Sequence, residues 1–208
     1  MAKLYFYYSA MNAGKTTTLL QSSHNYRERG MRTLLFMAAF DTRYGEKGKI
    51  VSRIGLESDA VIFDKDFSFY EYVAAEHAKT PLHCILVDEA HFMTTEHVYQ
   101  LTDIVDKLHI PVLTYGLRSD FRGTPFEPSK LLLALAEEIE EIKTICHCGR
   151  KATMNLRIDE HGNPVSEGNQ IEVGGNSRYV SLCRIHFKEG NSGQRAAEET
   201  FPLRQKSI

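Results

Sequence analysis

The sequence predicts an α/β protein in which helices cover both faces of a parallel sheet, followed by a smaller loop-rich unit. Apolar segments alternate along the chain with segments of helical pattern, which is typical of a sheet built from strand–helix–strand units. The apolar segments are continuous runs rather than in–out alternations, as expected for strands that are buried on both faces. At Cys146 the composition changes, and Cys, His, Gly and Asn replace the helical pattern.

The elements follow one another in a regular order. Residues 4–8 are β-rich, residues 9–13 are a loop of small side chains, and residues 14–29 are a helix that Gly30 ends. Residues 33–39 are the next strand. The remaining expected elements are a loop with one short strand at 41–55, a strand at 61–63, a helix at 67–77, a strand at 83–87, a helix at 95–108 capped by Thr94 or Thr95, a strand at 111–117, a helix at 129–137 and a strand at 139–145.

Composition and charge exclude several classes of protein. The net charge is −2, which does not favour a polyanion-binding protein. No apolar run approaches the roughly 20 residues of a membrane span, and the short apolar N-terminus is interpreted as a strand and not as a signal peptide. The chain has four cysteines, too few for a disulfide scaffold; most lie near the C-terminus, which indicates metal binding in a reducing compartment. We expect a cytoplasmic protein with no membrane partner.

The changes in composition divide the chain into three parts. Residues 1–143 are expected to form the α/β domain, and residues 144–190 the loop-rich domain. Residues 191–208 are polar, and we expect a mobile tail there.

A phosphate-binding loop is predicted at Ser9-Ala10-Met11-Asn12-Ala13-Gly14-Lys15-Thr16. A glycine before the lysine lets the backbone approach phosphate oxygens, and the N–H groups at the start of a helix face the anion. Lys15 would reach the β- and γ-phosphates, and the hydroxyl of Thr16 would hold Mg²⁺. The strict pattern begins with glycine where this chain has Ser9. The alternative is an ordinary strand–loop–helix turn.

Two acids follow the buried strand at residues 83–87 directly. An acid in this position supports Mg²⁺ in phosphate-loop proteins, so Asp88 is the candidate. Glu89 comes next and is the candidate general base toward an attacking hydroxyl or water. The alternative is that both acids merely cap the helix that starts near Thr95.

The letters Asp88-Glu89-Ala90-His91 are also the signature of one class of helicase. Such helicases need two ATPase domains with nucleic acid between them. This chain has room for one such domain, and its net charge is −2. We therefore interpret the match as a coincidence and expect no nucleic-acid partner.

Two short ligand pairs, Cys146-His147-Cys148 and Cys183-Arg184-Ile185-His186, predict a tetrahedral structural zinc site. A site with four protein ligands is closed and leaves no position for a catalytic water. The alternative is a set of free thiols. A loop-rich unit with little apolar core, however, needs a stabilising cross-link such as a bound metal ion. Cys84 lies in a strand and is expected in the core. The best ligands are Cys146, Cys148, Cys183 and His186, with His147 and His161 as the next candidates.

Taken together and in this order, five stretches of the chain resemble the thymidine kinases of the cellular and bacterial kind. The resemblance runs from residue 4 to about residue 188. The stretches are Met11-Asn12-Ala13-Gly14-Lys15-Thr16, Phe40-Asp41-Thr42-Arg43-Tyr44, Asp88-Glu89-Ala90-His91-Phe92, Gly116-Leu117-Arg118-Ser119-Asp120-Phe121-Arg122-Gly123 and Val173-Gly174-Gly175-Asn176-Ser177-Arg178-Tyr179.

The resemblance implies a RecA-like P-loop NTPase fold with a zinc-ribbon-like C-terminal domain. It implies transfer of the γ-phosphoryl group of ATP, with Mg²⁺, to the 5′-hydroxyl of thymidine, and it makes Glu89 the base. It also implies a homotetramer that thymidine triphosphate inhibits. The implied ATP and Mg²⁺ residues are Ser9, Ala10, Met11, Asn12, Ala13, Gly14, Lys15, Thr16, Asp41, Arg43, Asp88, Glu89, Ala90 and His91.

The resemblance further implies a nucleoside pocket, closed by a loop at residues 155–179 of the zinc unit. Apolar and aromatic side chains suit a flat pyrimidine base, although plain core packing is the alternative for the aromatic residues. Asp41 and Arg43 have the alternative of a solvated loop pair. The implied pocket residues are Met11, Phe92, Leu117, Phe121, Phe126, Val173, Gly174, Gly175 and Tyr179.

This chain departs from the family pattern at three places. Ser9 replaces the usual glycine, His91 replaces a frequent glutamine, and the first cysteine pair has one intervening residue where many members have two. Two other functions stay open on the sequence: a nucleic-acid-stimulated ATPase and a zinc adaptor for which ATP is only a ligand.

Overall fold

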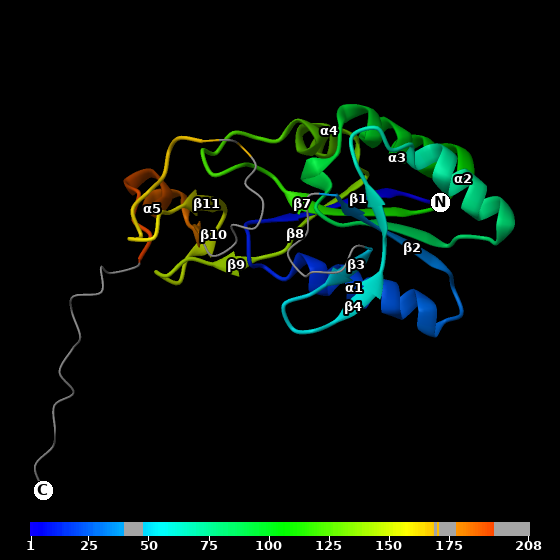
Figure 1. Ribbon diagram of the computed structural model, residues 1–208, viewed down its shortest axis with the longest axis horizontal. Coiled ribbons are helices and arrows are strands. Elements are labelled where there is room, and N and C mark those ends of the chain that lie inside the picture. Colours follow the sequence, from blue (N-terminus) through cyan, green and yellow to red (C-terminus); the bar gives the residue numbers. More distant parts are fainter. Residues whose placement is uncertain (40–47, 169, 171–177, 194–208) are drawn as a thin grey trace, which may run out of the picture.

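The computed structural model describes residues 1–39, 48–168, 170 and 178–193. Its centre is a six-stranded sheet with the strand order β5-β2-β6-β7-β1-β8, in which all neighbours run parallel (Figure 1). The predicted parallel α/β sheet is therefore confirmed. The strands are β1 (Leu4–Ser9), β2 (Thr33–Ala38), β5 (Val61–Phe63), β6 (Cys84–Val87), β7 (Val112–Leu117) and β8 (Glu138–Glu141).

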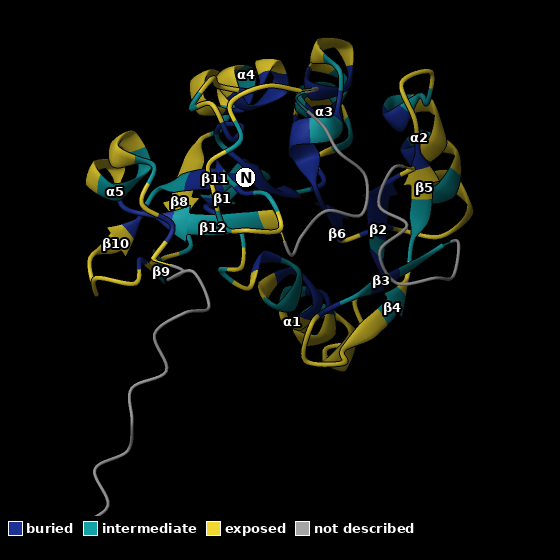
Figure 2. Cartoon of the chain, turned by 60° about the vertical axis from the view of Figure 1, so that its left-hand side comes forward, coloured by how far each residue is buried: buried dark blue, intermediate teal, exposed yellow. Residues whose placement is uncertain are grey.

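Helices cover both faces of this sheet. Alternate residues of one strand point to opposite faces, and β1 shows the separation clearly. Leu4 and Phe6 pack in a core with α2 (Phe69–Lys79), α3 (Thr95–Leu108) and α4 (Glu127–Leu135). Tyr5 and Tyr7 pack in a second core with Leu19 and Leu20 of α1 (Lys15–Glu28). Figure 2 shows the buried strands between α1 on one side and α3 and α4 on the other.

The expected elements differ from the structure mainly at their ends. Helix α2 lies two residues further along than predicted, and α4 starts at Glu127 because Pro128 is well placed in a first helical turn. Thr94 is the N-cap of α3, as predicted. The expected loop before residue 55 contains β3 (Lys49–Val51), but its antiparallel partner β4 (Glu57–Asp59) was not predicted because Glu-Ser-Asp has low β propensity.

The strand expected at residues 139–145 is wrong as a single element. The chain leaves β1 after Ile142, whose N–H donates to the carbonyl of Tyr8, and Thr144–Ile145 form β9 in a different sheet. The remaining part, β8, is an edge strand with the sequence Glu-Ile-Glu-Glu and not an apolar run. Charged residues are common on such edges because they block pairing with other chains.

The described residues of the C-terminal unit form two small antiparallel sheets and one helix. Strand β9 pairs with β10 (Lys151–Ala152), and β11 (Met154–Arg157) pairs with β12 (Tyr179–Leu182). Helix α5 (Arg184–Glu189) follows, although the sequence showed no helical pattern there. The unit has its own small core, which includes Leu156, Ile158 and Leu182.

No helix in the described part of the chain has both the length and the apolar character that a membrane span requires.

Candidate functional site

The loop between β1 and α1 has the backbone shape of an anion-binding turn. Asn12 has φ 62° and Gly14 has φ 88°, so two residues of this short loop are left-handed. A left-handed backbone strains any residue with a Cβ, which is why Gly14 suits this position at the start of α1. Such turns bring successive N–H groups to one side. Asn12 and Gly14 are exposed, whereas Ala10 is buried.

Lys15 and Thr16, the first two residues of α1, bind the start of the loop and a residue that is distant in the sequence. The ammonium group of Lys15 donates to the hydroxyl of Ser9 at 3.1 Å, and that hydroxyl donates to the carbonyl of Ala10. The hydroxyl of Thr16 donates to the carboxylate of Asp88 at 2.9 Å. Asp88 follows β6, and the structure therefore brings the loop and the acid together as the sequence predicted.

Asp88 is almost fully buried, and its other carboxylate oxygen accepts the N–H of Glu89 at 2.9 Å. Burial and the neighbouring charge of Glu89 raise the pKa of Asp88 to about 7. Glu89 is also buried and has φ 49°, a strained conformation for a non-glycine residue. Strain of this kind, which costs about 1–3 kcal/mol, is concentrated at functional sites.

The acids do not cap α3, so this alternative interpretation is excluded. Thr94 caps that helix: its hydroxyl accepts the N–H of His97, and its own N–H donates to Nδ1 of His97 at 3.1 Å. Asp88 and Glu89 instead precede a single 3₁₀ turn, Ala90–Phe92, in which Ala90 is fully buried.

His91 connects Glu89 to the aromatic residues of the site. Its Nδ1 accepts the N–H of Leu117 at 3.2 Å and lies 3.5 Å from a carboxylate oxygen of Glu89. Its ring lies 4.2 Å from that of Phe92 and 4.8 Å from that of Phe126. Leu117 ends β7 beside Ser9 of β1, so these groups share the carboxyl edge of the sheet.

A second aromatic pair joins the turn after β7 to the C-terminal unit. The ring of Phe121 lies 6.5 Å from that of Tyr179, and the guanidinium of Arg157 lies over the Phe121 ring. Phe121 and Phe126 are buried, and Phe92 packs against the main core, so core packing accounts for part of the role of these rings. The predicted site residues Asp41, Arg43, Val173, Gly174 and Gly175 lie outside the described residues.

The backbone of Met11 is held by the C-terminal unit. Its N–H donates to the side-chain oxygen of Asn155 at 2.7 Å, and its carbonyl accepts the hydroxyl of Ser181 at 2.6 Å. Neither Asn155 nor Ser181 was predicted from the sequence as a residue that contacts the phosphate loop. The only local sign of Asn155 is that it is a polar residue between the apolar Met154 and Leu156, and this does not indicate its partner.

The four predicted metal ligands converge. The ligand atoms of Cys146, Cys148, Cys183 and His186 all lie within 4.8 Å of one another. The Sγ atoms of Cys148 and Cys183 are 3.9 Å apart, and Sγ of Cys146 is 3.3 Å from Nδ1 of His186. Tetrahedral zinc with ordinary bond lengths requires about 3.8 Å and about 3.6 Å for such pairs, so the cluster fits zinc. The ring of His147 stacks on that of His186.

The electrostatics of Cys146 also fit a metal ligand. Burial disfavours its thiolate, but backbone hydrogen bonds from Cys148 and Cys183 and the contact with His186 lower its pKa to about 6. A thiolate is the form that binds zinc.

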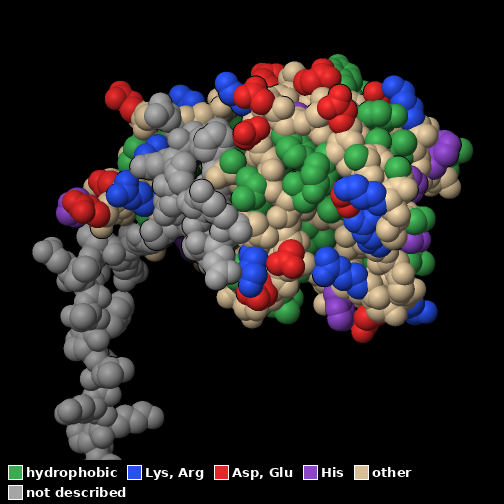
Figure 3. Space-filling view, turned by 45° about the vertical axis from the view of Figure 1, so that its right-hand side comes forward, with side chains coloured by type: hydrophobic (Ala, Val, Ile, Leu, Met, Phe, Trp, Pro, Cys, Tyr) green, Lys and Arg blue, Asp and Glu red, His purple; other side chains and the backbone are tan. Residues whose placement is uncertain are grey.

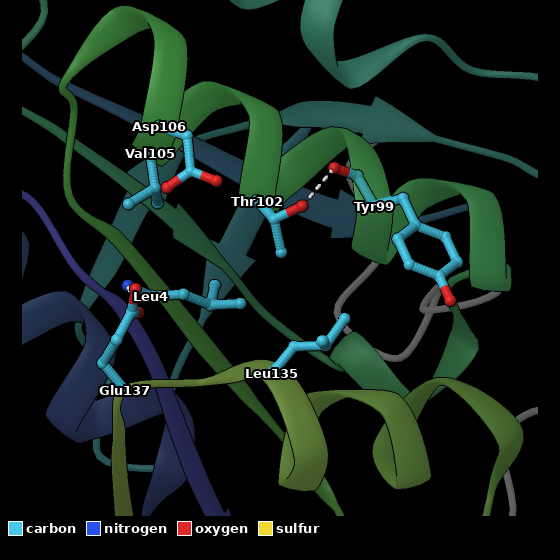
Figure 4. A pocket seen from close by; sticks show the side chains of 7 residues that line it. All are labelled: Leu4, Tyr99, Thr102, Val105, Asp106, Leu135 and Glu137. Atoms are coloured by element: carbon cyan, nitrogen blue, oxygen red, sulfur yellow. Dashed lines mark hydrogen bonds between the residues drawn. The ribbon is translucent and has the colours of Figure 1, made fainter.

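A hollow of about 270 Å³ lies elsewhere, between α3, the end of α4 and the start of β1 (Figure 4). Leu4 and Glu137 line it, at the amino end of β1, whereas Ser9 ends that strand. This hollow is therefore not part of the site at the carboxyl edge.

Fold and site together define an α/β protein that gathers a lysine, a threonine and two acids at the carboxyl edge of a parallel sheet, the edge where this class binds nucleotides. The comparisons with known proteins specify the family. A sequence model of the family described as thymidine kinase matches residues 2–187. The chain belongs to the thymidine kinase family.

The similarity extends over nearly the full length of the bacterial relatives. The thymidine kinase of Vibrio parahaemolyticus serotype O3:K6 is 62% identical over 189 residues, which are 91% of this chain and 98% of the relative. That of Agrobacterium fabrum is 61% identical, with 91% of this chain and 97% of the relative covered. That of Salmonella typhimurium is 58% identical, with coverages of 91% and 92%.

Proposed function

We propose that this chain transfers the γ-phosphoryl group of ATP to the 5′-hydroxyl of thymidine and so forms thymidine monophosphate. Membership of the thymidine kinase family supports the reaction and the acceptor. The observation that carries the proposal at the level of the site is the bond from Thr16 to Asp88, with Lys15 and Glu89 beside it. This arrangement offers groups for phosphate, metal and proton within one buried cluster.

In this mechanism the chain binds the phosphates through the amides of residues 12–16 and the ammonium group of Lys15. Thr16 and Asp88 would hold Mg²⁺, which, when bound, neutralises charge on the transferring phosphoryl group. Glu89 accepts the proton of the 5′-hydroxyl. Because Nδ1 of His91 accepts the N–H of Leu117, this nitrogen does not donate a proton to the nearby carboxylate of Glu89.

The aromatic groups provide the nucleoside pocket in this proposal. The rings of Phe121 and Tyr179 come from the turn after β7 and from the C-terminal unit, so a base between them would be covered by both parts. Met11, Phe92, Leu117 and Phe126 supply further apolar surface. Covering the site matters because water would otherwise accept the phosphoryl group.

The Cys/His cluster would hold a structural zinc ion in this proposal, with the domain boundary between residues 143 and 144. The resemblance also supports a homotetramer inhibited by thymidine triphosphate. A reducing compartment such as the cytoplasm suits the four cysteines, which are all free.

One assay distinguishes this proposal from the alternatives. The protein is incubated with γ-labelled ATP, Mg²⁺ and a panel of nucleosides, with and without DNA or RNA. We expect labelled thymidine monophosphate. A nucleic-acid-stimulated ATPase would instead release labelled phosphate when DNA or RNA is added, and a zinc adaptor would show no turnover. The face in Figure 3 carries acidic and basic side chains among apolar ones, which does not favour a polyanion there.

A further inference from the structure

Both polar groups of one peptide residue in the phosphate loop are bound by the C-terminal unit. Asn155 accepts the N–H of Met11 at 2.7 Å, and Ser181 donates to its carbonyl at 2.6 Å. Asn155 of β11 and Ser181 of β12 are direct cross-strand partners, so their side chains lie on the same face of this two-stranded ribbon. The two bonds join residues 144 and 170 positions apart in the sequence.

The loop needs such external support. Asn12, the next residue, has a left-handed backbone, a conformation that asparagine tolerates better than most residues with a Cβ but that still favours a loop held by its surroundings. Among the residues that the structure describes, no side chain caps the start of α1, and Asn12 and Gly14 are exposed. The two bonds at Met11 therefore fix the loop on the side that faces the ribbon.

The ribbon is itself well anchored. Asn155 is 97% buried, since only 3% of its surface is exposed. Ser181 lies two positions before Cys183, a member of the Cys/His cluster, and Leu182 between them is fully buried. The two hydrogen bonds to the loop therefore come from a buried part of the C-terminal unit, next to the Cys/His cluster.

We propose that Asn155 and Ser181 are positioning residues for ATP: through Met11 they hold the phosphate loop in the shape that binds the triphosphate. The C-terminal unit thereby acts on the phosphate donor as well as on the acceptor. Because the N–H of Met11 is used by Asn155, the amides that face phosphate start at Asn12. The inference rests on the proposed function for the identity of the ligand, which is ATP.

The test compares substitutions that remove or keep one bond. Ser181→Ala removes the donor to Met11, and Ser181→Thr keeps a hydroxyl and a residue type that suits a strand. Ser192→Ala is the matched control, because Ser192 makes the same kind of bond, to the carbonyl of Gly162 in the same unit. Asn155→Ala tests the second bond. Zinc content of each variant shows whether the C-terminal unit is intact.

We expect Ser181→Ala and Asn155→Ala to weaken binding of Mg²⁺ and a non-hydrolysable ATP analogue about three- to tenfold, the usual scale for one net hydrogen bond. The KM for ATP should rise by the same factor at full zinc content, whereas Ser181→Thr and Ser192→Ala should bind the analogue as the unsubstituted chain does. Unchanged binding of the analogue in both Ser181→Ala and Asn155→Ala would overturn the inference.

Hydrogen–deuterium exchange separates this inference from the proposed function, since it needs neither ATP nor thymidine. Peptides that cover residues 10–16 should exchange faster in Ser181→Ala than in Ser192→Ala, because opening of the loop becomes easier. Equal protection of these peptides in both variants would overturn the inference, even in a chain that phosphorylates thymidine. If these peptides exchange faster in Ser181→Ala but the unsubstituted chain makes no thymidine monophosphate, the support of the loop by Asn155 and Ser181 stands and only the proposed function is refuted.

Discussion

The ammonium group of Lys15 donates a hydrogen bond to the hydroxyl of Ser9 at 3.1 Å, and both side chains are buried. Ser9 stands where the family resemblance implies glycine. The hydroxyl thus gives Lys15 a partner in the loop before any phosphate is present. Binding of ATP has to exchange this bond for bonds to phosphate oxygens.

Ser9→Ala should therefore destabilise the free protein and tighten ATP binding. The substitution removes the bond from Lys15 and the bond to the carbonyl of Ala10, each of which contributes about 1 kcal/mol to the free energy of unfolding. The bond to Ala10 is lost equally from the free protein and the ATP complex. If Lys15 leaves Ser9 for phosphate, only the free protein loses the bond from Lys15, and the Kd for ATP falls roughly fivefold. Ser23→Ala on α1, which removes a buried hydroxyl bond to Thr33 of β2, is the control with lower stability and unchanged ATP binding. Weaker ATP binding in Ser9→Ala would contradict this role.

The pKa of Asp88 predicts a pH dependence of stability. Burial and Glu89 raise that pKa to about 7 in the folded chain, against 3.8 ordinarily. Between these values the unfolded chain has released a proton that the folded chain keeps. The free energy of unfolding without metal should therefore fall as pH rises, by up to about 1.4 kcal/mol per pH unit from this group, and level off above about pH 7.

Chemical denaturation at a series of pH values measures this dependence. Asp88→Asn cannot release the proton, so the difference in stability between the variant and the unsubstituted chain should change with pH in this window. A difference that stays constant from about pH 4 to about pH 8 would show that Asp88 is ionised throughout.

The Cys/His cluster predicts about one zinc ion per chain, retained after dialysis. Cys183→Ser should lose the metal and much of the stability of the C-terminal unit, because a unit with a small core depends on the bound metal as a cross-link. Cys84→Ala is the control: Cys84 is buried in β6, outside the cluster, and its removal should leave the zinc content unchanged. Metal analysis and thermal unfolding give the readout. A metal-free preparation with intact fold and activity would refute the structural role.

The hydrogen bond of Gln170 to Asp120 predicts an effect on the KM for thymidine, the phosphoryl acceptor. Its amide donates to the carboxylate of Asp120 at 3.1 Å, and the side chain of Asp120 has no exposed surface. The resemblance implies that residues 155–179 cover the base. Gln170→Glu places a second carboxylate against Asp120, so the KM for thymidine should rise roughly three- to tenfold with little change in the KM for ATP. Gln21→Glu, on the exposed face of α1, is the control. Equal KM values for thymidine in Gln170→Glu and Gln21→Glu would contradict a role of the bond between Gln170 and Asp120.

The sequence predicted the parallel sheet, the helices on both faces and the convergence of the four metal ligands, because periodicity and ligand spacing are local signals. It also led to Asp88, since a strand end and a following acid are adjacent in the chain. It missed β4 and α5, which are short and depend on tertiary contacts. It could not predict the bonds from Asn155 and Ser181 to Met11, because a pairing between distant segments follows from how the two parts pack.

Transfer of labelled phosphate to thymidine by the unsubstituted chain and by Glu89→Gln tests the account most directly. The turnover number should be at least about 100-fold lower in the variant, the usual scale for a general base, with ATP binding retained. The unsubstituted chain should release labelled thymidine monophosphate. An unchanged turnover number in Glu89→Gln would remove Glu89 from the role of base, and the absence of labelled thymidine monophosphate from the unsubstituted chain would contradict the proposed function.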